Sequence, residues 1–266
     1  MLRASSKKAL LWGAFLFLGA LPVLAACPPP TKVKTVRVEK VFDGDTVRLY
    51  SGTSVRLIGV NTPEMRYDIG KPEPGAEEAT AFLVQHASEI TQLQLGRDPR
   101  DRYGRTLAHL YFSSGKSVEE ALLERGFGFF ISIPPNTQLS DCLRQAENRA
   151  RNAQRGIWFG QRGPVAVSAL PSGHTGFSLL HGEITKVSKG RRAWYVELDD
   201  RVVLRIDTKV LARFDDAARI RLRPKDRVEV RGWLVDRGAS KSVLKKGYKP
   251  LILNISHPDH LRFLAD

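Results

Sequence analysis

Residues 36–50 have the sequence VRVEKVFDGDTVRLY, and this stretch decides the fold of the first half of the chain. Apolar and polar side chains alternate over 36–42 and again over 46–50, with the two-residue period of a β-strand. Asp43-Gly44-Asp45 between them is a turn sequence. The stretch therefore predicts two antiparallel strands joined by a short turn.

The residues that follow add further strands and then helices. Strand patterns recur over 55–60 and 106–112. Apolar residues at helical spacing predict helices over 76–87, 117–126 and 139–154. Because strands come first and helices are interleaved later, the pattern predicts an α+β domain.

The last hundred residues have a different pattern. Gly, Pro and Ser punctuate residues 161–176, which is typical of an interdomain linker. Strand patterns then follow over 179–187, 193–198, 201–207, 227–235 and 250–256, with a helical stretch near 209–218. Five strands with that helix placement resemble the oligonucleotide/oligosaccharide-binding (OB) barrel, although small β-sandwiches and SH3-like barrels give similar patterns. Residues 177–266 are therefore predicted to form a mainly β, OB-like barrel.

The chain of 266 residues is strongly basic. It has 42 Lys and Arg against 28 Asp and Glu, a formal charge of +14, and 42% hydrophobic residues, which argues against a disordered or fibrous chain. Residues 164–266 hold 20 basic and 12 acidic residues, so this part carries most of the excess. A basic domain favours a polyanion partner, either nucleic acid or an anionic membrane surface, although excess charge also serves solubility.

The N-terminal residues 1–26 have the pattern of a secretory signal, with basic residues before a short apolar run and small residues at its end. Leu24-Ala25-Ala26-Cys27 resembles a bacterial lipobox. That resemblance implies cleavage before Cys27 and a lipid on its thiol, with residues 27–35 as a lipidated tether. We therefore expect an exported protein held at the cell envelope by a membrane anchor. A plain secretory signal is the alternative, and it implies a periplasmic or secreted soluble protein.

Only two cysteines are present, Cys27 and Cys142. If Cys27 carries a lipid, no intramolecular disulfide is possible. Cys142 falls at an apolar position of the helix predicted over 139–154, so we expect it to be a buried free thiol.

Three charged residues of the first domain stand out: Arg56, Glu64 and Arg105. Arg56 shares strand parity with apolar residues, so its guanidinium must meet an anion, either a structural carboxylate or a ligand phosphate. Glu64 follows Thr62-Pro63, and Pro63 favours an extended Thr62, which fixes the direction in which the carboxylate leaves the strand. Each residue alone is typical of a solvated surface, but together they suggest a site for an anion.

Four stretches, VFDGDTV (41–47), VRLIGVNTPE (55–64), DRYGR (101–105) and GIW (156–158), resemble the staphylococcal nuclease (thermonuclease) family in order and spacing. The resemblance covers about residues 34–160. It implies a five-stranded OB-like barrel with three helices for residues 36–160. It also implies a Ca²⁺-dependent phosphodiesterase that cleaves DNA and RNA, typically leaving 3′-phosphate ends.

The resemblance also implies roles for single residues. Arg56, Glu64 and Arg105 form the catalytic set, with Glu64 as general base and the arginines on the scissile phosphate. Asp45, Asn61 and the Thr62 carbonyl oxygen hold Ca²⁺. Tyr103 lines the nucleotide site. The family usually has Asp in place of Asn61, which implies weaker calcium affinity, and tyrosines near Ile131 and Ile133, which implies weaker nucleotide contacts.

Lys186 and Lys189 lie beside Trp194 in the second domain, and cations next to aromatic faces are typical of nucleic-acid-binding OB surfaces. We expect these three residues to bind substrate, although one of Trp194 and Tyr195 must face the core. A solvated loop and a lipid-binding surface are alternatives. We expect a monomer without a nucleotide cofactor, although the sequence does not determine the oligomeric state. The second hypothesis for the whole chain is an envelope-anchored nucleic-acid-binding scaffold with little or no turnover.

Overall fold

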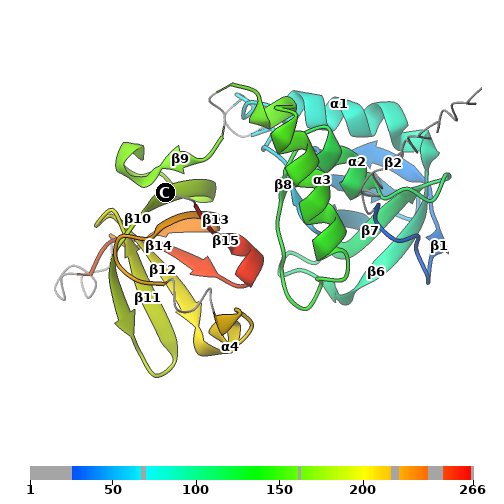
Figure 1. The fold of residues 1–266 in the computed structure, drawn as a ribbon. Helices are drawn as coiled ribbons and strands as arrows, with labels where there is room; N and C mark the ends of the chain where they lie inside the picture. The colour runs from blue at the N-terminus through cyan, green and yellow to red at the C-terminus, as the bar shows by residue number, and fades with distance from the viewer. Residues whose placement is uncertain (1–25, 67–69, 161–162, 217–221, 239–247, 265–266) are drawn as a thin grey trace, which may run out of the picture.

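The described residues fold into two parts, which lie side by side in Figure 1, and each part has a large hydrophobic core. One core is built from residues between Val47 and Ala146 and the other from residues between Val167 and Leu261. The computed structural model describes residues 26–66, 70–160, 163–216, 222–238 and 248–264.

The N-terminal part contains one curved sheet, a separate strand pair and three helices. The sheet has the order β1-β6-β7-β4-β3-β2. Its strands are β1 (Lys34–Thr35), β2 (Val38–Val41), β3 (Thr46–Leu49), β4 (Ser54–Leu57), β6 (Ile90–Arg100) and β7 (Thr106–Phe112). The separate pair joins β5 (Val60–Asn61) to β8 (Phe129–Phe130). The helices are α1 (Ala76–His86), α2 (Val118–Glu124) and α3 (Ser140–Asn152), with short 3₁₀ turns at Ala87–Glu89 and Gly156–Trp158.

The expected α+β class is confirmed, and the three helices fall within the ranges predicted for them. The two expected strands around the Asp43–Asp45 turn, β2 and β3, pair antiparallel. On its other edge β3 pairs with β4, where Val47 lies opposite Val55 and both side chains are fully buried. The long strand β6 was not predicted, because Gly96 and Pro99 interrupt its pattern. Antiparallel pairing with β7 along the sheet stabilises it there.

The C-terminal part is a closed five-strand barrel, which confirms the OB-like prediction. Its strands are β10 (Gly176–Lys189), β11 (Ala193–Leu198), β12 (Val202–Asp207), β13 (Arg227–Asp236) and β14 (Leu251–Ile255). They follow the order β13-β14-β12-β11-β10, and β13 pairs again with β10 to close the ring. The short helix α4 (Thr208–Leu211) lies between β12 and β13, and β15 (Leu261–Phe263) adds to β13 after a 3₁₀ turn at Pro258–His260.

Part of the expected linker packs against the barrel. β9 (Val165–Ala166) pairs with β10, and a 3₁₀ turn over Val167–Ala169 follows it. Val167 and Leu170 are buried in the barrel core, and the Arg201 guanidinium donates to the carbonyl oxygens of both. These apolar side chains three residues apart on one turn explain why residues 165–170 do not form a free linker.

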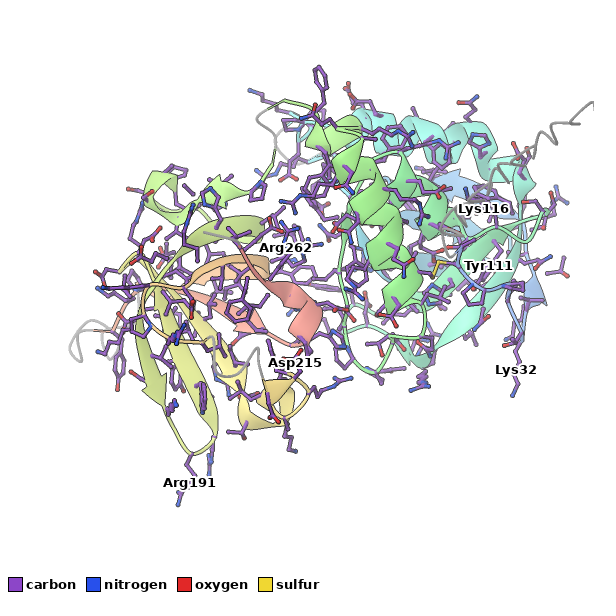
Figure 2. All side chains as sticks on the ribbon, viewed as in Figure 1. Lys32, Tyr111, Lys116, Arg191, Asp215 and Arg262 are labelled. Carbon is purple, nitrogen blue, oxygen red and sulfur yellow. A yellow bond between two sulfur atoms is a disulfide. The ribbon has the colours of Figure 1, made fainter. Side chains whose placement is uncertain are left out.

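The cysteines correct one expectation. Cys27 and Cys142 are joined by a disulfide, with Cα atoms 5.1 Å apart (Figure 2). A sulfur in a disulfide cannot carry a thioether lipid, so the predictions of a lipid on Cys27 and a free thiol on Cys142 are wrong for this structure. The end of the expected tether is part of the fold, because Lys34 and Thr35 form β1 and pair with β6. The expected signal, apart from Ala26, lies outside the described residues; within the described part, no helix is long and apolar enough to cross a membrane.

We expect reduction of this disulfide to lower the free energy of unfolding by about 2–5 kcal/mol, because the bond closes a long loop of the unfolded chain. The bond spans 115 positions in sequence. Urea unfolding with and without reductant measures the change, with Cys27→Ser as the matched variant. Thiol titration of the unfolded, unreduced protein should find no free thiol. Two free thiols and an unchanged unfolding midpoint would contradict the disulfide.

Candidate active site

The turn between β2 and β3 carries two carboxylates, Asp43 and Asp45. Asp45 is buried, and its Oδ2 accepts the Thr62 backbone N–H at 2.9 Å. Asp43 Oδ1 accepts the Asp45 backbone N–H at 3.0 Å. A Cβ on Gly44 would lie 2.6 Å from the Ala79 Cβ and 2.7 Å from Thr62 Oγ1, so only glycine allows this close approach to α1. The turn is thus held rigidly against the residues that follow β5.

The Arg56 guanidinium lies between this turn and β5. Its Nη1 donates to the carbonyl oxygens of Leu57 at 2.7 Å and Val60 at 2.8 Å. Its Nη2 lies 2.9 Å from Asp45 Oδ2 and donates to Asn61 Oδ1 at 3.1 Å. The anion that the parity of Arg56 required is therefore Asp45. Among the described residues, Nε is the Arg56 donor that has no acceptor.

Glu64 lies three residues after the end of β5, and its side chain is exposed. Its backbone N–H donates to Glu73 Oε2 at 3.0 Å, and its carbonyl accepts the Glu73 N–H at 2.9 Å, so the chain direction there is fixed. Partial burial raises the pKa of Glu64, with further increases from Asp45 and Glu73, while Arg56 and Arg105 oppose them. Both guanidinium groups therefore lie within electrostatic range of Glu64.

Asp43 is a site residue that the sequence analysis did not single out. Burial, with Asp45 and Glu64 nearby, raises the pKa of Asp43 to about 7. Crowded carboxylates with raised pKa values are typical of catalytic and cation-binding sites. The two acids flanking Gly44 were the available sequence signal, but we gave only Asp45 a metal role and interpreted Asp43 as a turn residue.

Arg105 extends from the turn after β6. Its Nε donates to Asp101 Oδ2 at 2.7 Å, and its backbone N–H donates to Asp101 Oδ1 at 2.8 Å. Neither of its Nη groups has an acceptor among the described residues, so both remain available for a bidentate contact with a phosphate. The Tyr103 ring lies 5.5 Å from the Arg105 guanidinium carbon, and Tyr103 is 67% exposed.

Residues 131–136 contain Ile131 and Ile133, near which the family usually has tyrosines. This segment contacts Gly59, just before β5, and Asp98 of β6. Ile131 is buried, whereas Ile133 is 42% exposed. The Asn136 amide holds the end of β6, because its Oδ1 accepts the Asp98 N–H at 2.9 Å and its Nδ2 donates to the Asp98 carbonyl at 2.8 Å. This segment therefore connects the strand that precedes Arg105 to β8.

The oxygen atoms around Arg56 suit a hard divalent cation. They include the carboxylates of Asp43 and Asp45 and the Asn61 amide, with Glu64 nearby, and Thr62 is held to Asp45 through its backbone N–H. Calcium accepts this mixture of carboxylate, amide and backbone oxygens. Within the described ranges, no three His, Cys, Asp or Glu side chains form a metal-holding group by themselves. The donor chemistry thus fits Ca²⁺ only if amide and backbone oxygens take part.

The substrate-binding residues expected in the barrel lie on the β10–β11 hairpin, whose tip carries Arg191 far from the N-terminal part (Figure 2). Lys189 Nζ sits 4.5 Å above the Trp194 ring, and Trp194 packs against the barrel core. Tyr195 is 40% exposed, so it is the aromatic residue of this pair that reaches solvent. Lys186 lies 3.7 Å from Glu197, which offsets part of its charge.

A family model described as "Staphylococcal nuclease homologue" matches residues 54–160, which include Arg56, Glu64 and Arg105. The thermonuclease of Staphylococcus intermedius is 32% identical over 125 residues, covering 46% of this chain and 74% of that protein. The chain belongs to the staphylococcal nuclease family. The thermonuclease of Staphylococcus hyicus is 31% identical over 130 residues, covering 76% of that protein.

A relative named as an endonuclease has a similar level of identity. Endonuclease YncB of Bacillus subtilis (strain 168) is 34% identical over 134 residues, covering 48% of this chain and 63% of that protein. The family model ends at Gly160, before the C-terminal barrel begins. Family membership therefore confirms the resemblance for the N-terminal part, and it says nothing of the barrel.

Proposed function

We propose that this chain is a calcium-dependent nuclease that hydrolyses phosphodiester bonds of DNA and RNA. The observation that carries the proposal is the position of Arg56, which bonds both Asp45 and Asn61 and lies within electrostatic range of Glu64. Relatives that are named thermonuclease and endonuclease support the same activity. A pure nucleic-acid binder would gain nothing from a carboxylate kept beside two guanidinium groups.

In the proposed reaction, Glu64 accepts a proton from the attacking water, whose oxygen forms a bond to phosphorus. The bond from phosphorus to the 5′ oxygen breaks, so the phosphate stays on the 3′ side and the leaving 5′ oxygen takes up a proton. Arg105 contacts the phosphate through its two Nη groups, while Arg56 contributes charge and its Nε–H. Arg56 already uses both Nη groups within the chain, so the bidentate contact with the phosphate is assigned to Arg105 in this proposal.

Calcium would be held by Asp45, the Asn61 amide oxygen and the Thr62 carbonyl, with Asp43 close enough to add negative charge. Bound there, the ion supplies positive charge beside the phosphate. Asn61 replaces a carboxylate with a neutral amide, and this amide oxygen also accepts a bond from Arg56. The site is therefore proposed to bind calcium more weakly than a site with two carboxylate ligands.

Metal removal tests the proposal on the wild-type protein. We expect single-stranded DNA and RNA to be cleaved in millimolar Ca²⁺, and EDTA to reduce cleavage to the level of a protein-free blank because phosphate charge is then uncompensated. Added Ca²⁺ should restore cleavage. A fluorescent, quenched oligonucleotide measures the rate. Binding of the oligonucleotide without cleavage at any calcium concentration would favour the scaffold alternative instead.

The barrel is proposed to add affinity for the nucleic-acid strand. The basic turn of the β10–β11 hairpin, Arg191 and Arg192, is exposed beside Lys189 and Tyr195, so phosphates and a stacked base could both be held. We expect Arg191→Ala to raise KM at unchanged kcat. The slope of log KM against log salt concentration should fall by about one, because one phosphate contact is lost. Unchanged KM and unchanged salt dependence would assign this hairpin another role.

We also propose that the protein is exported and works as a monomer outside the cytoplasm. Its N-terminal sequence has the pattern of a secretory signal. The disulfide between Cys27 and Cys142 supports an oxidising compartment, because such bonds persist there and are rare in the cytosol. The thiol titration described for the disulfide, applied to protein purified from its native location, tests this proposal.

A further inference from the structure

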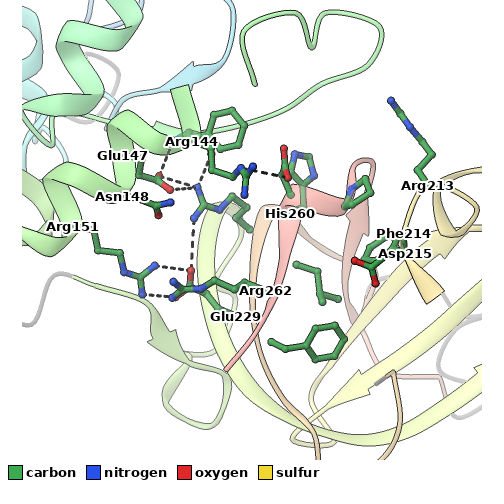
Figure 3. A pocket seen from close by; sticks show the side chains of 16 residues that line it. Arg144, Glu147, Asn148, Arg151, Arg213, Phe214, Asp215, Glu229, His260 and Arg262 are labelled. Atoms are coloured by element: carbon green, nitrogen blue, oxygen red, sulfur yellow. Dashed lines mark hydrogen bonds and ion pairs between the residues drawn. The ribbon is translucent and has the colours of Figure 1, made fainter. Parts of the chain in front are cut away.

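The two parts of the chain meet along α3 and β8 on one side and β13, β15 and the Pro258–His260 turn on the other. Glu147 and Arg151 of α3 face Glu229 and Arg262 of the barrel (Figure 3). A hollow of about 400 Å³ lies at this junction, and none of the proposed catalytic residues lines it. The junction is therefore separate from the proposed catalytic site, and binding of the phosphodiester does not account for its polar contacts.

One buried ion pair at this junction holds both backbone groups of Phe130. The Phe130 N–H donates to Glu147 Oε1 at 2.8 Å. The Phe130 carbonyl accepts from Arg231 Nη1 at 2.8 Å, and the same Nη1 lies 2.7 Å from Glu147 Oε2. The side chains of Glu147 and Arg231 are only 2% and 8% exposed. Arg231 belongs to the barrel and Glu147 to the nuclease part, so each part supplies one partner of the pair.

A second barrel residue binds the chain two residues further on. The Ser132 N–H donates to His260 Nε2 at 3.1 Å, and both residues are buried. Burial, together with Arg231 and His257, lowers the pKa of His260 to about 3. His260 is therefore neutral at physiological pH and able to accept this hydrogen bond.

The backbone that the barrel holds is also the backbone that positions Arg56. Phe130 of β8 pairs with Val60 of β5, and the Ile131 N–H donates to the Gly59 carbonyl at 3.2 Å. The Val60 carbonyl in turn accepts Arg56 Nη1 at 2.8 Å. A continuous chain of hydrogen bonds and strand pairing thus runs from Arg231 through β8 and β5 to Arg56.

We propose that Arg231, with Glu147, is a positioning residue of the nuclease: through β8 and β5 the barrel sets the place of the Arg56 guanidinium. This inference rests on the proposed nuclease function. It gives the barrel a part in catalysis that differs from affinity for the strand. A small displacement of a charge-stabilising group lowers kcat more than it raises KM, because the contact matters most in the transition state.

Docking energy alone does not explain this arrangement. Arg151 and Glu229 form another ion pair across the junction, at 2.6 and 2.8 Å, without touching the backbone of β8. Buried ion pairs often stabilise a fold no better than apolar residues of similar size. A pair that serves docking alone is therefore replaceable by methionines, whereas a pair that holds the Phe130 N–H and carbonyl is not.

The test compares four full-length variants: Arg231→Met, Glu147→Met, the double variant with both changes, and Arg151→Met as the matched control. We expect each single change in the pair to lower the thermal midpoint. The double variant should recover only the part lost to an unpaired buried charge, because the Phe130 N–H and carbonyl then lack their partners. We expect kcat to stay at least tenfold low in the double variant, with KM within threefold of wild type. Arg151→Met should keep wild-type kcat.

Amide hydrogen exchange across residues 59–61 and 129–132 gives a readout that does not depend on turnover. Exchange there should be faster in the double variant and unchanged in Arg151→Met. Recovery of wild-type kcat together with the thermal midpoint, or an equal loss of kcat in Arg151→Met, would overturn the proposal. If wild-type protein cleaves nothing, the proposed function fails, while unchanged exchange in the double variant separately contradicts the coupling.

Discussion

Glu64→Gln is expected to lower kcat about 10³-fold, because glutamine cannot accept a proton from water and general bases commonly contribute 10²–10⁴. Its side chain is exposed and its local structure depends on backbone bonds to Glu73, so folding should be unaffected. The measurement is single-turnover cleavage of an oligonucleotide at saturating Ca²⁺, with thermal unfolding in parallel.

Glu73→Gln provides the matched control for this prediction. Glu73 is also acidic and lies beside Glu64, but its carboxylate bonds the Glu64 backbone N–H and Arg66. Its activity should remain within a few-fold of wild type. A Glu64→Gln protein that keeps more than a tenth of the rate, or two variants with equal losses, would remove Glu64 from the proposed role.

Arg56→Lys is expected to lower both activity and stability, which sets it apart from the other arginine. Lysine keeps the charge but cannot bond Asp45, Asn61 and two backbone carbonyls at once. The side chains of Arg56 and Asp45 are only 14% and 7% exposed, so unmet partners remain buried. We expect a loss of 10²–10³ in kcat/KM and of about 1–3 kcal/mol in the free energy of unfolding.

Arg105→Lys is the control for this second prediction. The Arg105 side chain is 33% exposed, and among the described residues its guanidinium bonds only Asp101. Its replacement should therefore reduce activity without much loss of stability. Kinetics and urea unfolding of both variants distinguish the two roles. Equal stability losses, or full activity in Arg56→Lys, would contradict the proposal that Arg56 is held by bonds within the chain while the Nη groups of Arg105 contact the phosphate.

The sequence predicted the parts of this molecule that depend on local pattern. The alternation around Asp43–Asp45 predicted the paired strands, and helical spacing predicted the three helices. Strand parity alone predicted that Arg56 meets an anion, and the structure identifies this anion as Asp45. These features were predictable because neighbouring residues determine them.

Features that depend on contacts between distant residues could not be predicted in this way. The Cys27–Cys142 disulfide joins positions 115 apart, and a sequence motif at Cys27 favoured a different chemistry. Arg231 and Glu229 share one face of β13, and the sequence analysis assigned neither residue a role. Only docking against α3 makes them buried, and no local pattern contains that information.

The central claim is that Glu64 and the arginines act on one phosphodiester, and the double variant Glu64→Gln/Arg105→Lys tests it most directly. Residues that stabilise one transition state together have effects that do not multiply. In the same single-turnover assay, we expect the double variant to be about as slow as the slower single variant. A rate equal to the product of the two single losses, or a single variant with wild-type activity, would contradict the account.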